Sequence, residues 1–259
     1  MNEFKVAIVT GASSGIGAAV VKRLSSMNFK VIMLARDLCR MDLVAEQCKA
    51  KFKPVPIVID LKNSGSVNNA FAKIKKDFGH INVFCAVAGI FLNESPISKQ
   101  LDFEWNDVIE TNLTGVMRCL RSSWPLFSRG ASIVTVGSVL GHMSQPEVGA
   151  YAVSKAGLAA LTRTVASEGA SREIRANMIT PGMVNTPMNQ KMAEASGNTQ
   201  NWWSEKVSTI PLKRAAEPEE IAEAICWLSV ENSSFITGAE LRMDGGVLLG
   251  PLPGLEKNN

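Results

Sequence analysis

A tyrosine and a lysine stand four residues apart in the middle of this chain. Tyr151 is the only tyrosine in 259 residues, and Ala-Val-Ser separates it from Lys155. On a helix this spacing places both side chains on one face, about one turn apart. An ammonium near a phenol favours the phenolate, so we expect Lys155 to lower the pKa of Tyr151 from about 10. The pair is suited to acid–base chemistry.

Two further polar residues could belong to the same site. Ser138 follows an apolar, strand-like run at 131–136 and stands thirteen residues before Tyr151, so its hydroxyl could hold a substrate oxygen. Asn112 lies inside an apolar helical pattern, where its amide must find hydrogen-bond partners. It could equally cap the backbone at a helix kink. One tyrosine before a lysine can arise by chance, and a glycine-rich turn near the N-terminus makes chance less credible.

That turn joins the first apolar strand to the first helix. A strand at 4–10 precedes Gly11-Ala-Ser-Ser-Gly15-Ile-Gly17, and the helix that follows has an apolar face. Strand, turn and helix in this order direct backbone N–H groups and the helix dipole at an anion such as pyrophosphate. The spacing is GxxxGxG, not the GxGxxG of the commoner dinucleotide fingerprint. A tight turn that only requires positive φ is the alternative.

Apolar strands alternate with amphipathic helices along the whole chain. We expect strands at 4–10, 30–35, 55–59, 82–87, 131–136, 174–180 and 239–243. Beyond the glycine turn, we expect helices at 41–51, 64–78, 104–127, 149–167 and 218–228. The pattern predicts an α/β fold with a single domain over 1–250, a Rossmann-type doubly wound parallel sheet of about seven strands with helices on both faces. Residues 251–259 are expected to be a loose tail.

The composition argues against several other classes of protein. The chain is 46% apolar and 20% charged, with a formal net charge of +3. This charge is too small to indicate binding to nucleic acid or to an anionic membrane. No apolar run approaches the ~20 residues of a membrane span, and the first residues show no signal-peptide pattern. Five scattered cysteines and two histidines favour neither a disulfide framework nor a metal site. We therefore expect a cytoplasmic protein without a metal.

Together these motifs resemble those of the short-chain dehydrogenase/reductase family over nearly the whole chain. The matching pieces are Thr10-Gly-Ala-Ser-Ser-Gly-Ile-Gly17, Asp60, Asn112, Gly137-Ser138, Tyr151-Ala-Val-Ser-Lys155, Pro181-Gly182, Ile236-Thr-Gly238 and Asp244-Gly-Gly246. The resemblance implies nicotinamide hydride chemistry and a homo-oligomer, usually a tetramer and possibly a dimer. It also implies a catalytic tetrad of Asn112, Ser138, Tyr151 and Lys155. In the family the tyrosine exchanges the proton and the serine holds the carbonyl oxygen. The lysine binds the nicotinamide ribose and tunes the tyrosine, and the asparagine supports a water relay.

The same resemblance implies the residues that bind the cofactor. They are Gly11, Ser13, Ser14, Gly15, Ile16, Gly17, Arg36, Asp60, Leu61, Ala88, Gly89, Tyr151, Lys155, Pro181, Gly182, Val184 and Thr186. Enzymes that use NAD place an acid at the end of the second strand, whereas this chain has Arg36, a guanidinium suited to a 2′-phosphate. We therefore expect NADPH rather than NADH. Asp37 follows directly, so Arg36 could instead be a surface residue paired locally.

One stretch departs from the family pattern. The family often has Asn-Asn-Ala-Gly after the fourth strand, and this chain has Ala86-Val-Ala-Gly89. Without the asparagines, we expect apolar packing there.

The segment 183–207 leaves the carboxyl end of the sixth strand, where ligands bind in open α/β sheets. It is rich in methionine and tryptophan and has a glycine-containing break at 196–198, so we expect a lid over an apolar substrate. One of its tryptophans could instead pack in the core or in a subunit contact. The residues expected to contact the substrate are Ser138, Leu140, His142, Met143, Met183, Met188, Trp202 and Trp203.

The predicted activity is the reversible, NADPH-dependent reduction of a ketone or aldehyde in a small to medium apolar molecule. A 3-oxoacyl-(acyl-carrier-protein) reductase is the alternative within the family. By resemblance, Arg129 and Arg172 lie where such enzymes have basic residues near the carrier docking surface, although lone surface arginines can simply be solvated charge. A non-catalytic NADP-binding scaffold is the alternative of another class. We would expect such a scaffold to lose part of the tetrad, and none is lost.

Overall fold

A parallel sheet of seven strands, in the order β3-β2-β1-β4-β5-β6-β7, forms the centre of the computed structural model, which describes residues 4–143 and 145–250. The strands are β1 (Val6–Thr10), β2 (Lys30–Ala35), β3 (Val55–Val58), β4 (Ile81–Ala86), β5 (Phe127–Val136), β6 (Arg175–Pro181) and β7 (Glu240–Met243). The strand order reverses between β1 and β4, which opens a crevice at the carboxyl ends of these strands. The tail expected at 251–259 lies outside the described residues.

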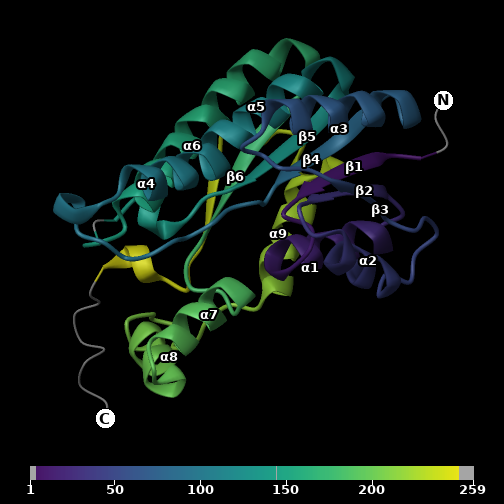
Figure 1. Ribbon diagram of the computed structural model, residues 1–259. Helices are drawn as coiled ribbons and strands as arrows, with labels where there is room; N and C mark the ends of the chain where they lie inside the picture. Colours follow the sequence, from purple (N-terminus) through teal and green to yellow (C-terminus); the bar gives the residue numbers. More distant parts are fainter. Residues whose placement is uncertain (1–3, 144, 251–259) are drawn as a thin grey trace.

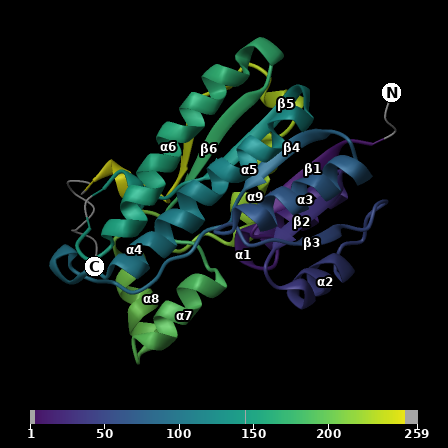
Figure 2. The same ribbon diagram turned by 45° about the horizontal axis from the view of Figure 1, so that its top comes forward.

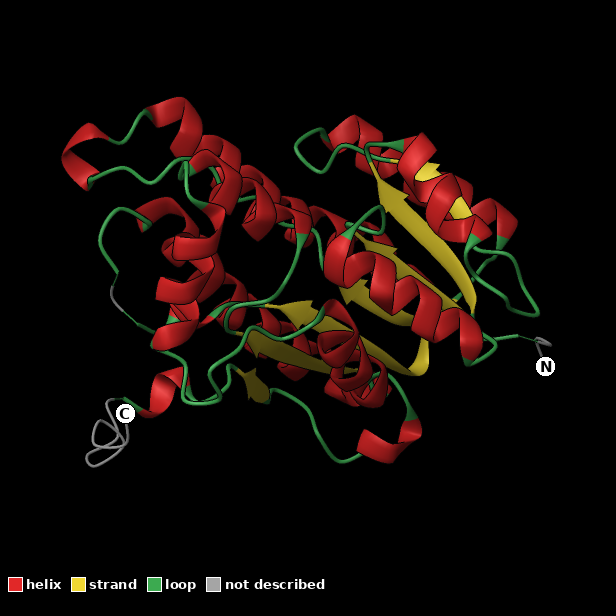
Figure 3. Cartoon of the chain, turned by 90° about the horizontal axis from the view of Figure 1, so that it is seen from below, coloured by secondary structure: helices red, strands yellow, loops and turns green. Residues whose placement is uncertain are grey.

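Helices cover both faces of this sheet (Figures 1 and 3). On one face lie α3 (Ser64–Asp77), α5 (Gly115–Ser123) and α6 (Gly149–Gly169), and on the other lie α1 (Gly15–Ser26), α2 (Leu38–Glu46) and α9 (Pro218–Leu228). Each face has its own apolar cluster, one around Phe84 and Leu158 and the other around Leu24 and Met33. Because most strands are buried on both sides, their sequences are nearly continuous apolar runs. The predicted fold is confirmed.

The single helix predicted over 104–127 is wrong. The chain forms α4 (Asp102–Ile109), a π-helical turn (Glu110–Thr114), α5 and a 3-10 turn (Trp124–Leu126), and β5 already begins at Phe127. A π-turn inserts one extra residue, so the apolar periodicity continues through it almost unchanged. Pro125 cannot donate a backbone hydrogen bond and therefore ends the helical stretch.

The second helix also begins earlier than its apolar pattern suggests. We expected it at 41–51, and α2 spans Leu38–Glu46. Asp37 caps it, because its carboxylate accepts a 3.0 Å hydrogen bond from the backbone N–H of Arg40. The cap places the start of α2 directly after β2, at the edge of the crevice.

Two short helices, α7 (Pro187–Ala195) and α8 (Thr199–Ser208), project together beyond the end of β6 (Figures 1 and 2). The side chains of Thr186 and Asn198 cap them. They occupy the segment that the sequence predicts to be a lid.

Within residues 4–143 and 145–250, no helix is long and apolar enough to cross a membrane. In the same ranges, no three His, Cys, Asp or Glu residues gather in a group that could hold a metal ion.

Candidate active site

The glycine-rich turn packs so closely that two of its positions require glycine. Gly11 has a φ of 67°, and a Cβ there would lie 2.8 Å from the Cα of Ala88. A Cβ on Gly17 would lie 2.1 Å from the carbonyl oxygen of Gly11. The first turn of α1 is thereby held against the ends of β1 and β4. Its free backbone N–H groups lie where an anion would be favoured.

A threonine hydroxyl supplies the polar link that we did not expect after β4. The backbone N–H groups of Val87 and Ala88 both donate to Thr10 Oγ1, each at 3.1 Å. Val87 and Ala88 also pack against the two apolar clusters, as expected for this departure from the family pattern. Thr10 stands directly before the glycine turn, and sequence reasoning gave it no role of its own.

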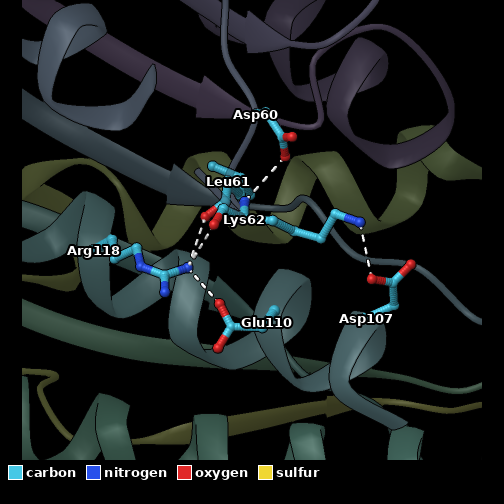
Figure 4. A network of polar contacts seen from close by, with 6 residues as sticks. All are labelled: Asp60, Leu61, Lys62, Asp107, Glu110 and Arg118. Carbon is cyan, nitrogen blue, oxygen red and sulfur yellow. Dashed lines mark hydrogen bonds and ion pairs between the residues drawn. The ribbon is translucent and has the colours of Figure 1, made fainter. Parts of the chain in front are cut away.

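A polar network fastens the end of β3 to the π-turn (Figure 4). The Arg118 guanidinium donates to the carbonyl groups of the two residues after Asp60, at 3.3 and 3.2 Å, and to the Glu110 carboxylate at 2.6 Å. Lys62 pairs with Asp107 at 2.9 Å, and the Asp60 carboxylate accepts from the backbone N–H of Lys62 at 3.0 Å. The network fixes the loop that carries Asp60 relative to the π-turn.

Asn112 lies in that π-turn, is fully buried, and has its amide satisfied by the protein. Its Oδ1 accepts from the backbone N–H of Ile90 at 2.8 Å, and its Nδ2 donates to the carbonyl of Ile90 at 2.9 Å and to Ser154 Oγ at 3.2 Å. The Ser154 hydroxyl donates to the carbonyl of Tyr151 at 2.7 Å. Asn112 therefore caps backbone groups at a break in the helix, which is the alternative role that the sequence left open. It also connects the loop after β4 to α6. Sequence reasoning missed Ser154, whose only signal was its place inside the tyrosine–lysine motif.

Ser138, Tyr151 and Lys155 come together at the carboxyl end of β5. Ser138 caps a 3-10 turn (Val139–Gly141), and its hydroxyl forms a hydrogen bond with the Tyr151 hydroxyl. The Lys155 ammonium donates to the carbonyl of Val136 at 2.9 Å and lies 5.5 Å from the centre of the Tyr151 ring. Phe91 packs against the same ring with centroids 5.1 Å apart. Two hydroxyls and a buried cation thus share one small volume.

Burial controls the protonation of this pair. It raises the pKa of Tyr151 to about 12, opposed by the hydrogen bond with Ser138, and it lowers the pKa of Lys155 to about 8. The expectation that Lys155 would lower the pKa of Tyr151 is therefore wrong for this structure. The phenolate would lose its hydration, and the ammonium is directed at the Val136 carbonyl instead. At neutral pH the site presents a protonated phenol beside a cation, which suits proton donation.

A cavity of about 580 Å³ runs from the glycine turn to α7 and α8. Every residue expected to bind the cofactor lines it. Of the residues expected to contact the substrate, it is lined by Ser138, Leu140, Met143, Met183, Met188 and Trp202. Further lining residues that sequence reasoning missed include Phe91, Gln145, Asn189, Met192 and Lys206. Cofactor and substrate residues therefore meet in a single space.

His142 and Trp203 do not line this cavity, contrary to expectation. The imidazole Nε2 of His142 contacts the Glu240 carboxylate on β7, to which the Thr180 hydroxyl also donates. The carboxylate draws the imidazole towards β7 instead of the cavity. Trp203 packs edge-on against Trp202, with ring centroids 5.0 Å apart, and so supports the indole that faces the cavity.

Two guanidinium groups and one carboxylate border the cavity beyond β2. The Asp37 carboxylate caps α2 and pairs with Arg40 at 3.4 Å. Arg36 is exposed, lines the cavity, and forms no ion pair with any residue in the described ranges. Arg36 therefore does not pair with Asp37, which was the alternative that the sequence left open.

Comparison with known proteins gives matches over most of the chain. A short-chain dehydrogenase family model described as "Enoyl-(Acyl carrier protein) reductase" matches residues 11–248. The 3-oxoacyl-[acyl-carrier-protein] reductase FabG of Thermotoga maritima is 34% identical over 252 residues, 95% of this chain and 99% of that protein. A cis-4-hydroxycyclohexanecarboxylate dehydrogenase of Sinomonas cyclohexanicum is 34% identical over 244 residues, 93% of this chain and 96% of that protein.

Comparison with solved structures gives the same result as comparison with sequences. The ligand-free aldohexose dehydrogenase of Thermoplasma acidophilum superposes with a TM-score of 0.86 at 30% identity, covering 96% of both chains. The fold, the cavity and the sequence similarity all indicate the same protein family. The chain is an oxidoreductase and belongs to the short-chain dehydrogenase/reductase family.

Proposed function

We propose that this protein catalyses the reversible reduction of a ketone or aldehyde in a small to medium apolar molecule, with NADPH as the reductant. One observation carries the proposal: the hydroxyls of Ser138 and Tyr151 border the same cavity as the glycine-rich turn. A carbonyl placed at these hydroxyls therefore lies in the same space as a dinucleotide held by the turn.

The residues present fit a nicotinamide dinucleotide phosphate. The glycine-rich turn lines the cavity and carries backbone N–H donors suited to a pyrophosphate. Arg36 and Arg40 would hold a 2′-phosphate, since the carboxylate between them is already engaged. When bound, the nicotinamide supplies the hydride.

The protein groups then hold the oxygen and move the proton. Ser138 donates a hydrogen bond to the carbonyl oxygen, and Tyr151, protonated at neutral pH, transfers its proton to that oxygen. Lys155 lines the cavity together with Gly89, a residue expected to bind the cofactor, so we expect its ammonium to bind a ribose hydroxyl. Its positive charge, 5.5 Å from the centre of the Tyr151 ring, opposes without cancelling the loss of hydration that disfavours the phenolate left by proton transfer. Asn112 holds the loop after β4 and the Tyr151 turn in register.

Reduction of a carrier-bound 3-oxoacyl group is the second candidate, favoured by the 34% identity to the Thermotoga maritima reductase. The two arginines singled out for carrier docking do not support it. Arg129 pairs with Glu173 at 2.5 Å, and Arg172 donates to the carbonyls of Trp124 and Phe127. Arg129 lies near the start of β5 and Ser138 just beyond its end, nine residues later, so the extended chain separates them by up to about 30 Å.

We also propose that the protein is a homo-oligomer, and a tetramer by family expectation. Among the exposed large apolar side chains are two pairs, Leu101 and Phe103 at the start of α4 and Phe235 and Leu241 around β7. Exposed apolar groups of this size mark protein contacts. Light scattering coupled to gel filtration tests this, and a monomer at micromolar concentration would refute it.

Turnover of a ketone and aldehyde panel, with NADPH and NADH in parallel, tests the proposed reaction. We expect oxidation of NADPH with at least one apolar carbonyl compound, and no turnover by the Tyr151→Phe variant. Cofactor binding without turnover of any carbonyl compound would favour a non-catalytic scaffold. Turnover confined to carrier-bound substrates would favour the second candidate.

A further inference from the structure

A lysine of the lid borders the substrate half of the cavity. Lys206 lies in the last turn of α8, and it lines the cavity together with Trp202 of the same helix and Thr209, the residue that follows the helix. Its ammonium lies 5.6 Å from the centre of the Trp202 ring, and the residue is half-buried. Within the described ranges it forms no ion pair.

The cavity that Lys206 lines also has apolar side chains in its substrate half. They include Met188 and Met192 on α7 and Phe91 and Leu140 from other segments. A cation beside apolar groups is destabilised by loss of hydration unless an anion or hydrogen-bond acceptors complete its shell. The substrate half of the cavity therefore combines an apolar middle with a positive end.

The indole and the carboxyl-terminal end of α8 explain why the ammonium stays at this wall. Both attract a cation. Neither occupies the three N–H donors of a lysine in the way that carboxylate oxygens do. Apart from Lys155, the other charged residues that line the cavity belong to its cofactor end, with one exception. This exception is Glu94, an exposed carboxylate in the loop after β4. Glu94 does not pair with Lys206 in this structure.

We propose that Lys206 binds a carboxylate at the end of the substrate remote from the reacting carbonyl. The substrates are then oxo acids with an apolar middle, and the products are the corresponding hydroxy acids. This inference rests on the proposed carbonyl reduction. The carbonyl carbon gains a hydride, its oxygen gains the proton of Tyr151, and the carboxylate passes through the reaction unchanged.

The experiment compares each oxo acid of a graded series, 4-oxocyclohexanecarboxylate among them, with its own methyl ester. The ester keeps the carbonyl and the apolar middle and removes the charge. We expect the wild-type protein to have a kcat/KM about tenfold higher for the acid that fits best than for its ester. Lys206→Met should raise the KM for that acid about tenfold and leave the ester within about twofold.

Lys191→Met is the matched control. Lys191 is an exposed lysine of the other lid helix and does not line the cavity, so its loss removes the same charge from the same lid. We expect it to leave both members of the pair unchanged. Added salt should weaken the acid preference of the wild-type protein and have little effect on the ester.

Glu94→Gln separates carboxylate binding from a lid latch. If Lys206 only pairs with Glu94 when the lid closes, Glu94→Gln and Lys206→Met will impair acid and ester alike, and the inference is overturned. Carboxylate binding predicts that Glu94→Gln lowers or leaves unchanged the KM for the acid. Turnover of esters without acid preference overturns the inference and leaves the proposed function standing. No turnover of any carbonyl compound overturns both.

Discussion

Cofactor choice is the property of this site most open to a quantitative test, because the proposed preference for NADPH depends largely on one exposed guanidinium. Arg36 lines the cavity without an ion-pair partner in the described ranges, whereas the neighbouring carboxylate of Asp37 is engaged by the N-terminus of α2 and by Arg40. Arg36→Leu keeps much of the aliphatic stem and removes the charge. We expect it to raise the KM for NADPH and to leave the KM for NADH nearly unchanged.

The size of the effect follows from the position of Arg36. A charge-assisted hydrogen bond contributes ~1.5–3 kcal/mol. Because the guanidinium is exposed, solvent and salt screen it, so the lower end of this range applies. The ratio of kcat/KM for NADPH to that for NADH should therefore fall about tenfold.

The assay is initial-rate kinetics with both cofactors at a fixed, saturating carbonyl substrate. Arg40→Leu serves as the comparison, since it removes a second guanidinium and also releases Asp37 from its ion pair. A freed carboxylate can accept hydrogen bonds from the ribose hydroxyls of NADH, so this variant should lower the KM for NADH as well as raise that for NADPH. An unchanged cofactor ratio in Arg36→Leu would show that Arg36 is only a surface residue.

Three further predictions concern catalysis and the lid. Tyr151→Phe removes the donated proton and should lower kcat by at least a factor of about 10². NADPH binding, measured by fluorescence titration, should be retained, and near-normal turnover would contradict the assignment of Tyr151 as the proton donor. Because burial lowers the pKa of Lys155 to about 8, the ammonium is lost at lower pH than usual, so kcat/KM for reduction should be level below pH 8 and fall above it. A profile level to about pH 10 would show that this charge is not needed. NADPH and substrate together should slow hydrogen exchange across 183–207, and Trp202→Ala should weaken discrimination by substrate size more than Trp203→Ala, since only Trp202 lines the cavity. Unchanged exchange and equal discrimination would refute the lid.

The edge of the sheet that carries the site was predictable because its signals are local. A parallel α/β sheet brings the carboxyl ends of its strands to one edge, so the glycine turn after β1, Asp60 after β3 and Ser138 after β5 had to lie near one another. Except for Tyr151 and Lys155 on α6, the residues expected to bind the cofactor follow strand ends in the same way, and all of them line the cavity. The order of strands and the family resemblance were together sufficient to predict this lining.

Contacts between distant segments were not predictable in the same way. His142 follows Ser138 closely and was expected in the cavity wall, but Glu240 on β7 holds its imidazole elsewhere. The π-turn at Asn112 hides within a continuous apolar pattern, since one inserted residue shifts the helix face only slightly. Pro125 was the local sign that the helix ends, and the apolar residues around it concealed that sign.

The protonation of Tyr151 shows most clearly where spacing stops being informative. Four residues on a helix place an ammonium near the phenol, and Coulomb attraction then predicts a lowered pKa. The sign depends on how much water both groups lose, which spacing does not contain. Here the phenol is desolvated, its pKa rises to about 12, and the ammonium donates to the Val136 carbonyl. Lys155 is itself desolvated, so its pKa falls to about 8. The raised pKa of Tyr151 keeps its proton in place at neutral pH, which is the protonation state that the proposed reduction requires.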